Sequence, residues 1–228
     1  PKLEKLKLQS GFQAEHLFIP SDHEMGSWVS MTFDDQDRLI VSDQYGFLYR
    51  MELPPVGADS LTPKIEKLKI QTEDPVADSV IQMGYAQGLL YAFNSLYVMV
   101  NHGGNEDFEK SSGLYRLEDL DGNDQYDKIS LLKSLEGRGE HGPHSIVMAP
   151  DGESLFVIAG NHTDVPEMDA YRVPPVWKED NLFPQIKDPR GHANDRGAPG
   201  GWIAQIDPEG KNWELYAVGF RNPFDLAF

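Results

Sequence analysis

The sequence predicts an all-β protein with the β-propeller fold, in which residues 1–228 form roughly the first three to four blades as one partial domain. Short runs of β-branched and aromatic residues alternate with Asp, Asn and Gly turns, as in antiparallel strands. Three of these turns lie about 60 residues apart, at Asp34, Asn94 and Asp151. A Gly-x-Leu-Tyr-Arg segment at residues 46–50 returns, one residue shorter, at 113–116. A repeat of this length, with four strands per unit, indicates a propeller with long loops, and a β-sandwich with coincidental hairpins is the alternative.

The N-terminal part of the chain precedes the first repeat. Residues 2–8 alternate Lys or Glu with Leu, which favours an edge strand, and residues 16–19 form a second short apolar run. The first repeat then offers three strands in up-and-down order, at residues 27–33, 38–42 and 47–51.

The later repeats follow the same order. The second repeat has strands at residues 88–93, 96–100 and 113–117, and the third has strands at 145–149, 154–159 and 201–207. The delayed last strand leaves a long loop insertion at about residues 161–200, and loops of this length usually carry function. A fourth repeat opens at Arg221 and stops inside an apolar run at Phe228, so we expect a segment of a longer protein.

Composition and charge exclude several function classes. The 37 acidic and 20 basic residues give a net charge of −17, which repels phosphate backbones and makes nucleic acid an unsuitable partner. Cysteine is absent, which rules out disulfides, thiolate zinc sites and a covalently attached c-type haem within these residues. No apolar run approaches the roughly 20 residues of a membrane-spanning helix.

A candidate site follows from the repeat. The innermost strand of each propeller blade lines the central channel, so the residues at its start face the channel mouth. In successive repeats these residues are Ser27 with Trp28, then Gln87, then His141, then Arg221 with Asn222. A base, a cation and amides that converge on one place are typical of an active site.

Histidines supply the candidate base. His141 follows Glu140 and precedes Gly142-Pro143, so we expect it outside the strand with its ring in the channel mouth; a loop histidine bonded to backbone is the alternative. His144 is expected to start the strand as a packed or channel-lining residue. His162 and His192 lie on or beside the long loop, where they either contact substrate or are solvated.

The segment 119–127 resembles a calcium-binding loop. Oxygen ligands recur at its odd positions, at Asp119, Asp121, Asn123, Gln125 (through its backbone carbonyl) and Asp127. Asp124 replaces the glycine of the sixth position, and Ser130 stands where a bidentate Glu belongs. A weak structural Ca²⁺ site and a plain Asp-Gly turn are both consistent with this pattern.

Three segments carry a resemblance to a known family. Residues 141–160, 201–210 and 219–228, above all the Arg-Asn-Pro of the last segment, resemble the glucose/sorbosone dehydrogenase family, closest to its large exported bacterial branch with haem-binding domains. The resemblance implies a six-bladed propeller quinoprotein that uses pyrroloquinoline quinone (PQQ) and Ca²⁺. It also implies oxidation of a sugar or polyol by hydride transfer to PQQ, a cytochrome c domain or protein as electron acceptor, and a periplasmic or extracellular location.

The resemblance also implies residue roles. His141 matches the base that takes the substrate hydroxyl proton, Arg221 and Asn222 match cofactor contacts, with Arg221 polarising the quinone oxygen, and Gln87 matches a glutamine near the sugar. Glu140 stands where the soluble glucose enzymes have Asp. The family's ligands for the cofactor calcium belong to later blades.

Two other functions fit a propeller. A lactonase or hydrolase with a channel calcium requires carboxylates and amides at the channel mouth, whereas His and Arg predominate here. A carbohydrate-binding propeller without catalysis retains the fold and lacks the cofactor.

Overall fold

Three antiparallel sheets follow one another along the chain. The computed structural model describes residues 3–58, 60–70, 83–102, 111–174 and 199–228. The first sheet contains β1 (Trp28–Phe33), β2 (Leu39–Asp43), β3 (Leu48–Glu52) and β4 (Lys64–Lys67). The second contains β5 (Ala86–Ala92), β6 (Ser95–Val100), β7 (Gly113–Glu118) and β8 (Lys128–Ser134). The third contains β9 (Pro143–Met148), β10 (Leu155–Ala159), β12 (Gly201–Ile206), β13 (Trp213–Phe220) and, on its outer edge, β11 (Ala170–Tyr171).

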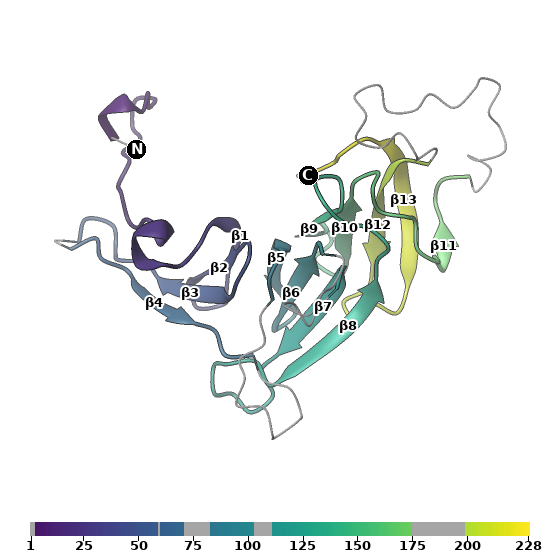
Figure 1. The fold of residues 1–228 in the computed structure, drawn as a ribbon, viewed down its shortest axis with the longest axis horizontal. Coiled ribbons are helices and arrows are strands. Elements are labelled where there is room, and N and C mark those ends of the chain that lie inside the picture. The colour runs from purple at the N-terminus through teal and green to yellow at the C-terminus, as the bar shows by residue number, and fades with distance from the viewer. Residues whose placement is uncertain (1–2, 59, 71–82, 103–110, 175–198) are drawn as a thin grey trace.

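Each sheet is a propeller blade. Its four main strands pair in chain order, each antiparallel to the next, and the first strand of every sheet packs against the first strand of the next sheet. Strands β1, β5 and β9 therefore lie innermost, and the three sheets follow an arc around them (Figure 1). This arrangement confirms the predicted all-β propeller fold. It also locates the fourth, outer strand of each blade, whose residues the sequence patterns had not identified.

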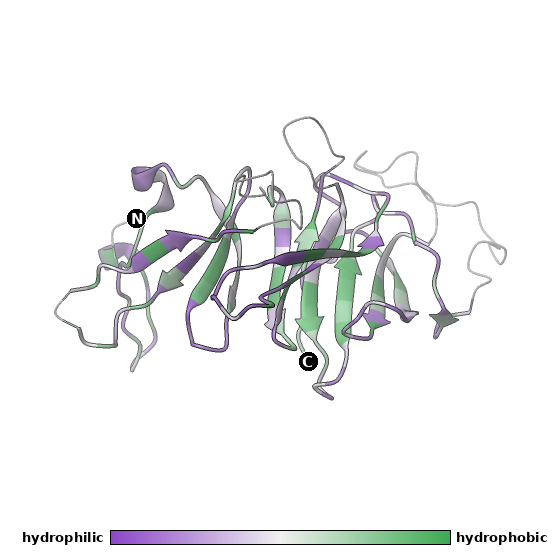
Figure 2. Ribbon diagram, turned by 90° about the horizontal axis from the view of Figure 1, so that it is seen from below, coloured by the Kyte–Doolittle hydropathy of each residue, from purple (hydrophilic) through white to green (hydrophobic). Residues whose placement is uncertain are grey.

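The core lies between the blades. One buried cluster joins β2 and β3 to the second blade through residues such as Ile40, Leu48, Leu96 and Val98. Another joins the second and third blades around the fully buried Trp202, which is 0% exposed. Sheets that are covered on both faces bury apolar residues on both, so the central strands are continuous apolar runs. The connecting loops are mainly hydrophilic (Figure 2).

Every inner strand begins with a bulge. The register shifts between Trp28 and Ser30 in β1, between Ala86 and Gly88 in β5, and beside Pro143 in β9, so each inner strand carries one extra residue there. Bulges re-aim side chains and are common next to binding sites. Gln87 is the extra residue of β5, so it lies within this strand rather than before it.

Both predicted N-terminal strands were wrong. Leu3–Lys5 forms a 3₁₀ turn, and residues 16–19 lead into a second 3₁₀ helix at Pro20–His23. The short apolar runs serve packing instead, since the Phe18 ring stacks on Trp28 at 5.3 Å and covers the outer face of the first blade. Trp28 faces this cluster, and its indole N–H donates to the Met25 carbonyl. It therefore does not point into the channel mouth.

The opening of the fourth repeat forms no strand. Residues 222–228 run alongside β9, where Ser145 Oγ donates to Asp225 Oδ1 at 3.0 Å and the Phe228 ring contacts Phe156 at 5.2 Å. Part of the predicted 161–200 insertion, 175–198, lies outside the described residues. The described part adds β11, which pairs parallel with β13.

Candidate functional site

Two glycines allow neighbouring segments to pack closely against the loop before β9. A Cβ at Gly142 would lie 2.2 Å from the Asn101 side-chain oxygen, and a Cβ at Gly160 would lie 2.4 Å from the His141 carbonyl oxygen. Only glycine permits these approaches without displacement. Asn101 Nδ2 also donates to the Gly139 carbonyl at 2.8 Å. The backbone at His141 is thus fixed by close packing as well as by hydrogen bonds.

The His141 ring is completely buried, with 0% exposure, and contacts a polar side chain at each nitrogen. Nδ1 lies 2.6 Å from Asn161 Oδ1, and Nε2 lies 3.2 Å from Arg221 Nη1. An amide oxygen accepts and a guanidinium donates, so the contacts select the tautomer with a proton on Nδ1 and a lone pair on Nε2. A base needs that lone pair, which Nη1 of the exposed Arg221 side chain contacts in this structure.

Asn161 links the two repeats. Its side chain contacts His141, and its backbone N–H donates to the Arg221 carbonyl at 2.9 Å. It comes two residues after β10, which ends at the same edge as the start of β9. Asn161 and Asn101 were not among the predicted site residues. The available signal was their position, since each lies within two residues of the end of the second strand of its blade.

His144 lies within β9 and is 3% exposed, in agreement with the expected packed position. Its Nε2 lies 2.7 Å from Asn222 Oδ1, and its ring packs on Phe224 at 4.8 Å. Burial lowers the pKa of His144 below the usual 6.5, against the opposing effect of the Asn222 hydrogen bond. This histidine is therefore held neutral inside the sheet packing.

The other predicted residues differ in how close they come to His141. The His162 ring packs on the His141 ring at 5.1 Å, and the His162 backbone N–H donates to the His141 carbonyl at 3.0 Å. Glu140 is exposed on the same loop. Gln87 sits next to Gly88, which packs against the His144 backbone. His192 lies outside the described residues.

The structure thus brings His141, Asn161, Arg221 and His162 together and places His144 with Asn222 beside them. No protein-family model and no curated protein matches the sequence. Among solved structures, the chain is similar to a Thermus thermophilus protein assigned as an oxidoreductase (glucose dehydrogenase), with 16% sequence identity and a TM-score of 0.47. The match covers 86% of this chain and 52% of that chain, so this chain spans about half the length of the Thermus protein.

Two residues of the site, Arg221 and Asn222, carry groups that suit PQQ. Arg221 offers an exposed guanidinium and Asn222 an amide at the same edge of the third blade, and both are suited to the carboxylates and carbonyls of a quinone acid. The two residues fit part of such a ligand.

The predicted calcium loop lies at the opposite ends of the strands from His141. Asp119, Asp121 and Asp127 each offer one oxygen, and these oxygens lie within 4.8 Å of one another. This spacing fits a single Ca²⁺. Asn123 instead donates to Asp121 Oδ2, and the Gln125 side chain accepts from the Lys69 backbone N–H at 2.7 Å. Three of the five predicted ligands thus group their oxygens, and the predicted Gln125 ligand, its backbone carbonyl, is not the atom that contacts Lys69.

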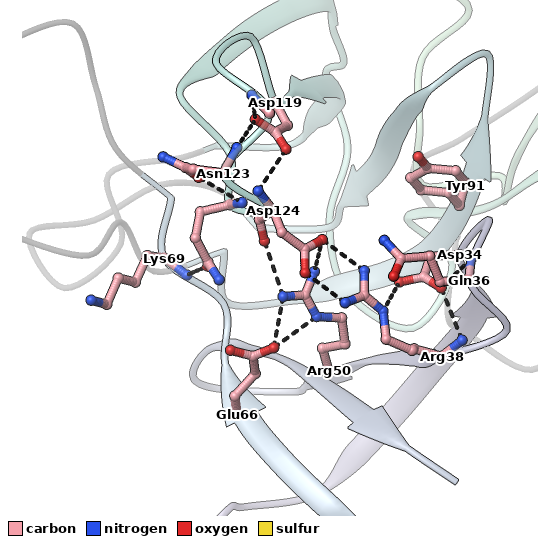
Figure 3. A network of polar contacts seen from close by, with 12 residues as sticks. Asp34, Gln36, Arg38, Arg50, Glu66, Lys69, Tyr91, Asp119, Asn123 and Asp124 are labelled. Atoms are coloured by element: carbon pink, nitrogen blue, oxygen red, sulfur yellow. Dashed lines mark hydrogen bonds and ion pairs between the residues drawn. The ribbon is translucent and has the colours of Figure 1, made fainter.

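Asp124, at the sixth position of that loop, has a structural role that the calcium-loop pattern did not indicate. Its backbone adopts φ = 68°, and its carboxylate accepts from Arg38 Nη1 and Nη2 at 2.6 and 2.7 Å. Arg50 Nη1 donates to the same carboxylate at 2.8 Å and also pairs with Glu66 (Figure 3). The second blade is thus joined to the first through one carboxylate.

The described part of the chain holds no helix with the length and apolar character that membrane crossing demands.

Proposed function

We propose that this chain is part of a quinoprotein-type dehydrogenase that oxidises a sugar or polyol. The observation that carries the proposal is the contact between His141 and Arg221. Two residues 80 positions apart, each at the start of a repeat, meet at 3.2 Å. Asn161 fixes the tautomer that leaves a lone pair on His141 Nε2.

This arrangement suits removal of a hydroxyl proton. An alcohol oxygen that takes the place of the Arg221 guanidinium comes within hydrogen-bond distance of His141 Nε2, where a general base has to act. The Asn161 amide then stabilises the imidazole orientation as the ring gains the proton. Arg221, displaced by one side-chain rotation, places a permanent positive charge next to the oxygen that becomes negative. When bound, PQQ would supply the quinone that accepts the hydride.

The whole-protein features remain part of the same proposal. They are a six-bladed ring, bound Ca²⁺, a c-type cytochrome as electron acceptor and a periplasmic or extracellular location. The hydrolase alternative receives less support, because the three grouped carboxylates lie at the opposite strand ends from His141.

Paired histidine variants test the proposal. In the protein supplied with PQQ and Ca²⁺, His141→Gln is expected to lower sugar-dependent dye reduction by about 10² to 10⁴-fold, the usual contribution of a general base. His144→Gln serves as the matched control, since His144 lies three residues away and contacts Asn222 rather than Arg221. It should lower stability more than turnover. Equal turnover loss in both variants would contradict the assignment of the base.

A further inference from the structure

Hydrogen bonds link neighbouring repeats at the strand ends that carry His141. In each link, one repeat contributes a residue that lies within two positions of the end of its second strand. The Gln44 carbonyl accepts from the Tyr85 N–H at 2.7 Å, which joins the first repeat to the second. The Asn161 N–H donates to the Arg221 carbonyl at 2.9 Å, which joins the third repeat to the fourth. Both links use backbone atoms, so they place little demand on the side chains.

The link between the second and third repeats is made by a side chain. Asn101 directly follows β6, and its Nδ2 donates to the Gly139 carbonyl at 2.8 Å. The Asn101 backbone N–H donates to the Tyr85 carbonyl at 2.9 Å, which anchors this residue in the second blade. At this junction, therefore, the identity of one side chain decides whether the link forms.

The Asn101 amide contacts the His141 loop on both sides of the histidine. Gly139, which accepts the hydrogen bond, precedes His141 by two residues, and Gly142 follows it directly. A Cβ at Gly142 would lie 2.6 Å from Asn101 Cγ and Nδ2 and closer still to Oδ1, so the amide packs directly against the Gly142 backbone. A shift of the loop away from the second blade lengthens the hydrogen bond, and a shift toward it compresses the contact with Gly142.

The same amide carries a cost in stability. Asn101 is only 7% exposed, and its buried Oδ1 has no hydrogen-bond partner within the described residues. A buried acceptor without a donor destabilises the fold, and an apolar side chain avoids this cost. The Gly139 carbonyl also accepts from the Gly142 N–H at 2.9 Å, so it retains a donor without Asn101. Folding alone therefore gives little reason for an amide at position 101.

We infer that Asn101 is a positioning residue, which sets the place of His141 relative to Arg221. It acts from the second blade on a residue that precedes the third, through the backbone of the loop rather than through the imidazole. The contact of 3.2 Å between His141 Nε2 and Arg221 Nη1 depends on this placement. The effect on turnover rests on the proposed function, in which His141 is the base, whereas the effect on the histidine ring does not.

Histidine NMR tests the inference without cofactor or substrate. In long-range ¹H–¹⁵N spectra of the purified protein, the His141 signals are those that His141→Gln removes. Asn101→Ala is expected to shift these signals and to speed exchange of the Nδ1 proton with water by about tenfold, the typical contribution of one hydrogen bond. Asn212→Ala is the matched control, because Asn212 Nδ2 also donates one hydrogen bond, at 2.9 Å to Asp207, but in the β12–β13 turn at the opposite strand ends.

Kinetics and stability separate positioning from a purely structural role. In the protein supplied with PQQ and Ca²⁺, Asn101→Ala should lower kcat by about 10 to 10²-fold and change KM by less than about twofold, because a misplaced base affects the transition state more than substrate binding. Urea unfolding should change little, since the variant also removes the unpaired Oδ1. If Asn101→Ala does not fold, Asn101→Asp keeps the shape of the side chain, loses the donor and carries the same expectations.

The outcomes distinguish this inference from the proposed function. Unchanged His141 signals in a folded Asn101 variant would disprove the positioning role, whether or not the rate falls. Shifted His141 signals in a protein whose unmodified form oxidises no sugar would contradict the proposed dehydrogenase alone.

Discussion

The carboxylate of Asp124 joins two blades, and replacing it tests how much such a contact contributes to stability. Asp124→Asn removes the charge and keeps the side-chain size, and Asn tolerates the left-handed φ of 68°. The Arg38 and Arg50 side chains are only 13% and 5% exposed, so both guanidiniums lose a partner that solvent replaces poorly. Figure 3 shows both converging on this one carboxylate.

The expected loss follows from these contacts. Hydrogen bonds to charged groups contribute about 1.5–3 kcal/mol each when buried. The Asp124 side chain is 44% exposed, which screens both pairs, and Asn keeps one acceptor oxygen. We therefore expect a loss of about 2 kcal/mol in the free energy of unfolding at pH 7. For a protein of this size that lowers Tm by roughly 4 to 8 °C.

The pH dependence gives the assay a second readout. The hydrogen bond from Arg38 is the main effect that lowers the pKa of Asp124 below its ordinary 3.8, and it outweighs desolvation. The charged pair therefore stabilises the fold above about pH 4, and this stabilisation disappears as pH falls through the lowered pKa. Urea unfolding of both proteins should show a gap at pH 7 that narrows in acid.

Asp37→Asn is the matched control. Asp37 is an exposed aspartate with φ = 58° in the β1–β2 turn, so its replacement should change stability by less than about 0.5 kcal/mol. If Asp124→Asn unfolds with the same free energy as the unmodified protein, the inter-blade carboxylate contributes nothing and the reasoning is wrong.

Three further predictions concern the loops at either end of the strands. The Tm of the unmodified protein should fall as pH falls below 6.5, because burial lowers the pKa of His144. The Tm of His144→Gln should depend less on pH in this range, and an equal dependence in both proteins would contradict the role of His144. Gly160→Ala places a Cβ 2.4 Å from the His141 carbonyl oxygen and should cost about 1–3 kcal/mol in urea unfolding, whereas unchanged stability would mean that the loop shifts freely. At 10 mM Ca²⁺, a site with a Kd of about 1 mM should raise the free energy of unfolding by about 1.4 kcal/mol, and Asp121→Ala should abolish this rise. No stabilisation by Ca²⁺ would identify residues 119–127 as a plain turn.

The repeat made most of the fold predictable. Spacing between Asp34, Asn94 and Asp151 placed three hairpins correctly, because each inner hairpin is a continuous apolar run closed by a tight turn. The residues of the outer strands β4, β8 and β13 were not identified. In β4, Lys64–Lys67 is mostly exposed and three of its four residues are charged, which is typical of a loop. The N-terminal apolar runs misled the prediction, since alternation alone does not show whether a pairing partner exists.

Within the site, repeat equivalence pointed to His141 and Arg221, but it also pointed to Trp28, which packs in another cluster, and it gave none of the contacts. His141 and Arg221 come together because both begin a repeat. The complete burial of His141 depends on Gly142 and Gly160, whose close approaches involve residues distant in sequence. Asn161 follows a strand that a local pattern identifies, yet its contact with His141 depends on the pairing of β9 with β10.

The most direct test of the central claim is an oxidation assay on the purified protein with and without PQQ, in the presence of Ca²⁺ and an electron-accepting dye. The account predicts that a sugar or polyol reduces the dye only when PQQ is present, and that His141→Gln lowers the rate by about 10² to 10⁴-fold. Dye reduction that is undiminished in His141→Gln would contradict it, as would hydrolysis of a sugar lactone that requires Ca²⁺ and no quinone.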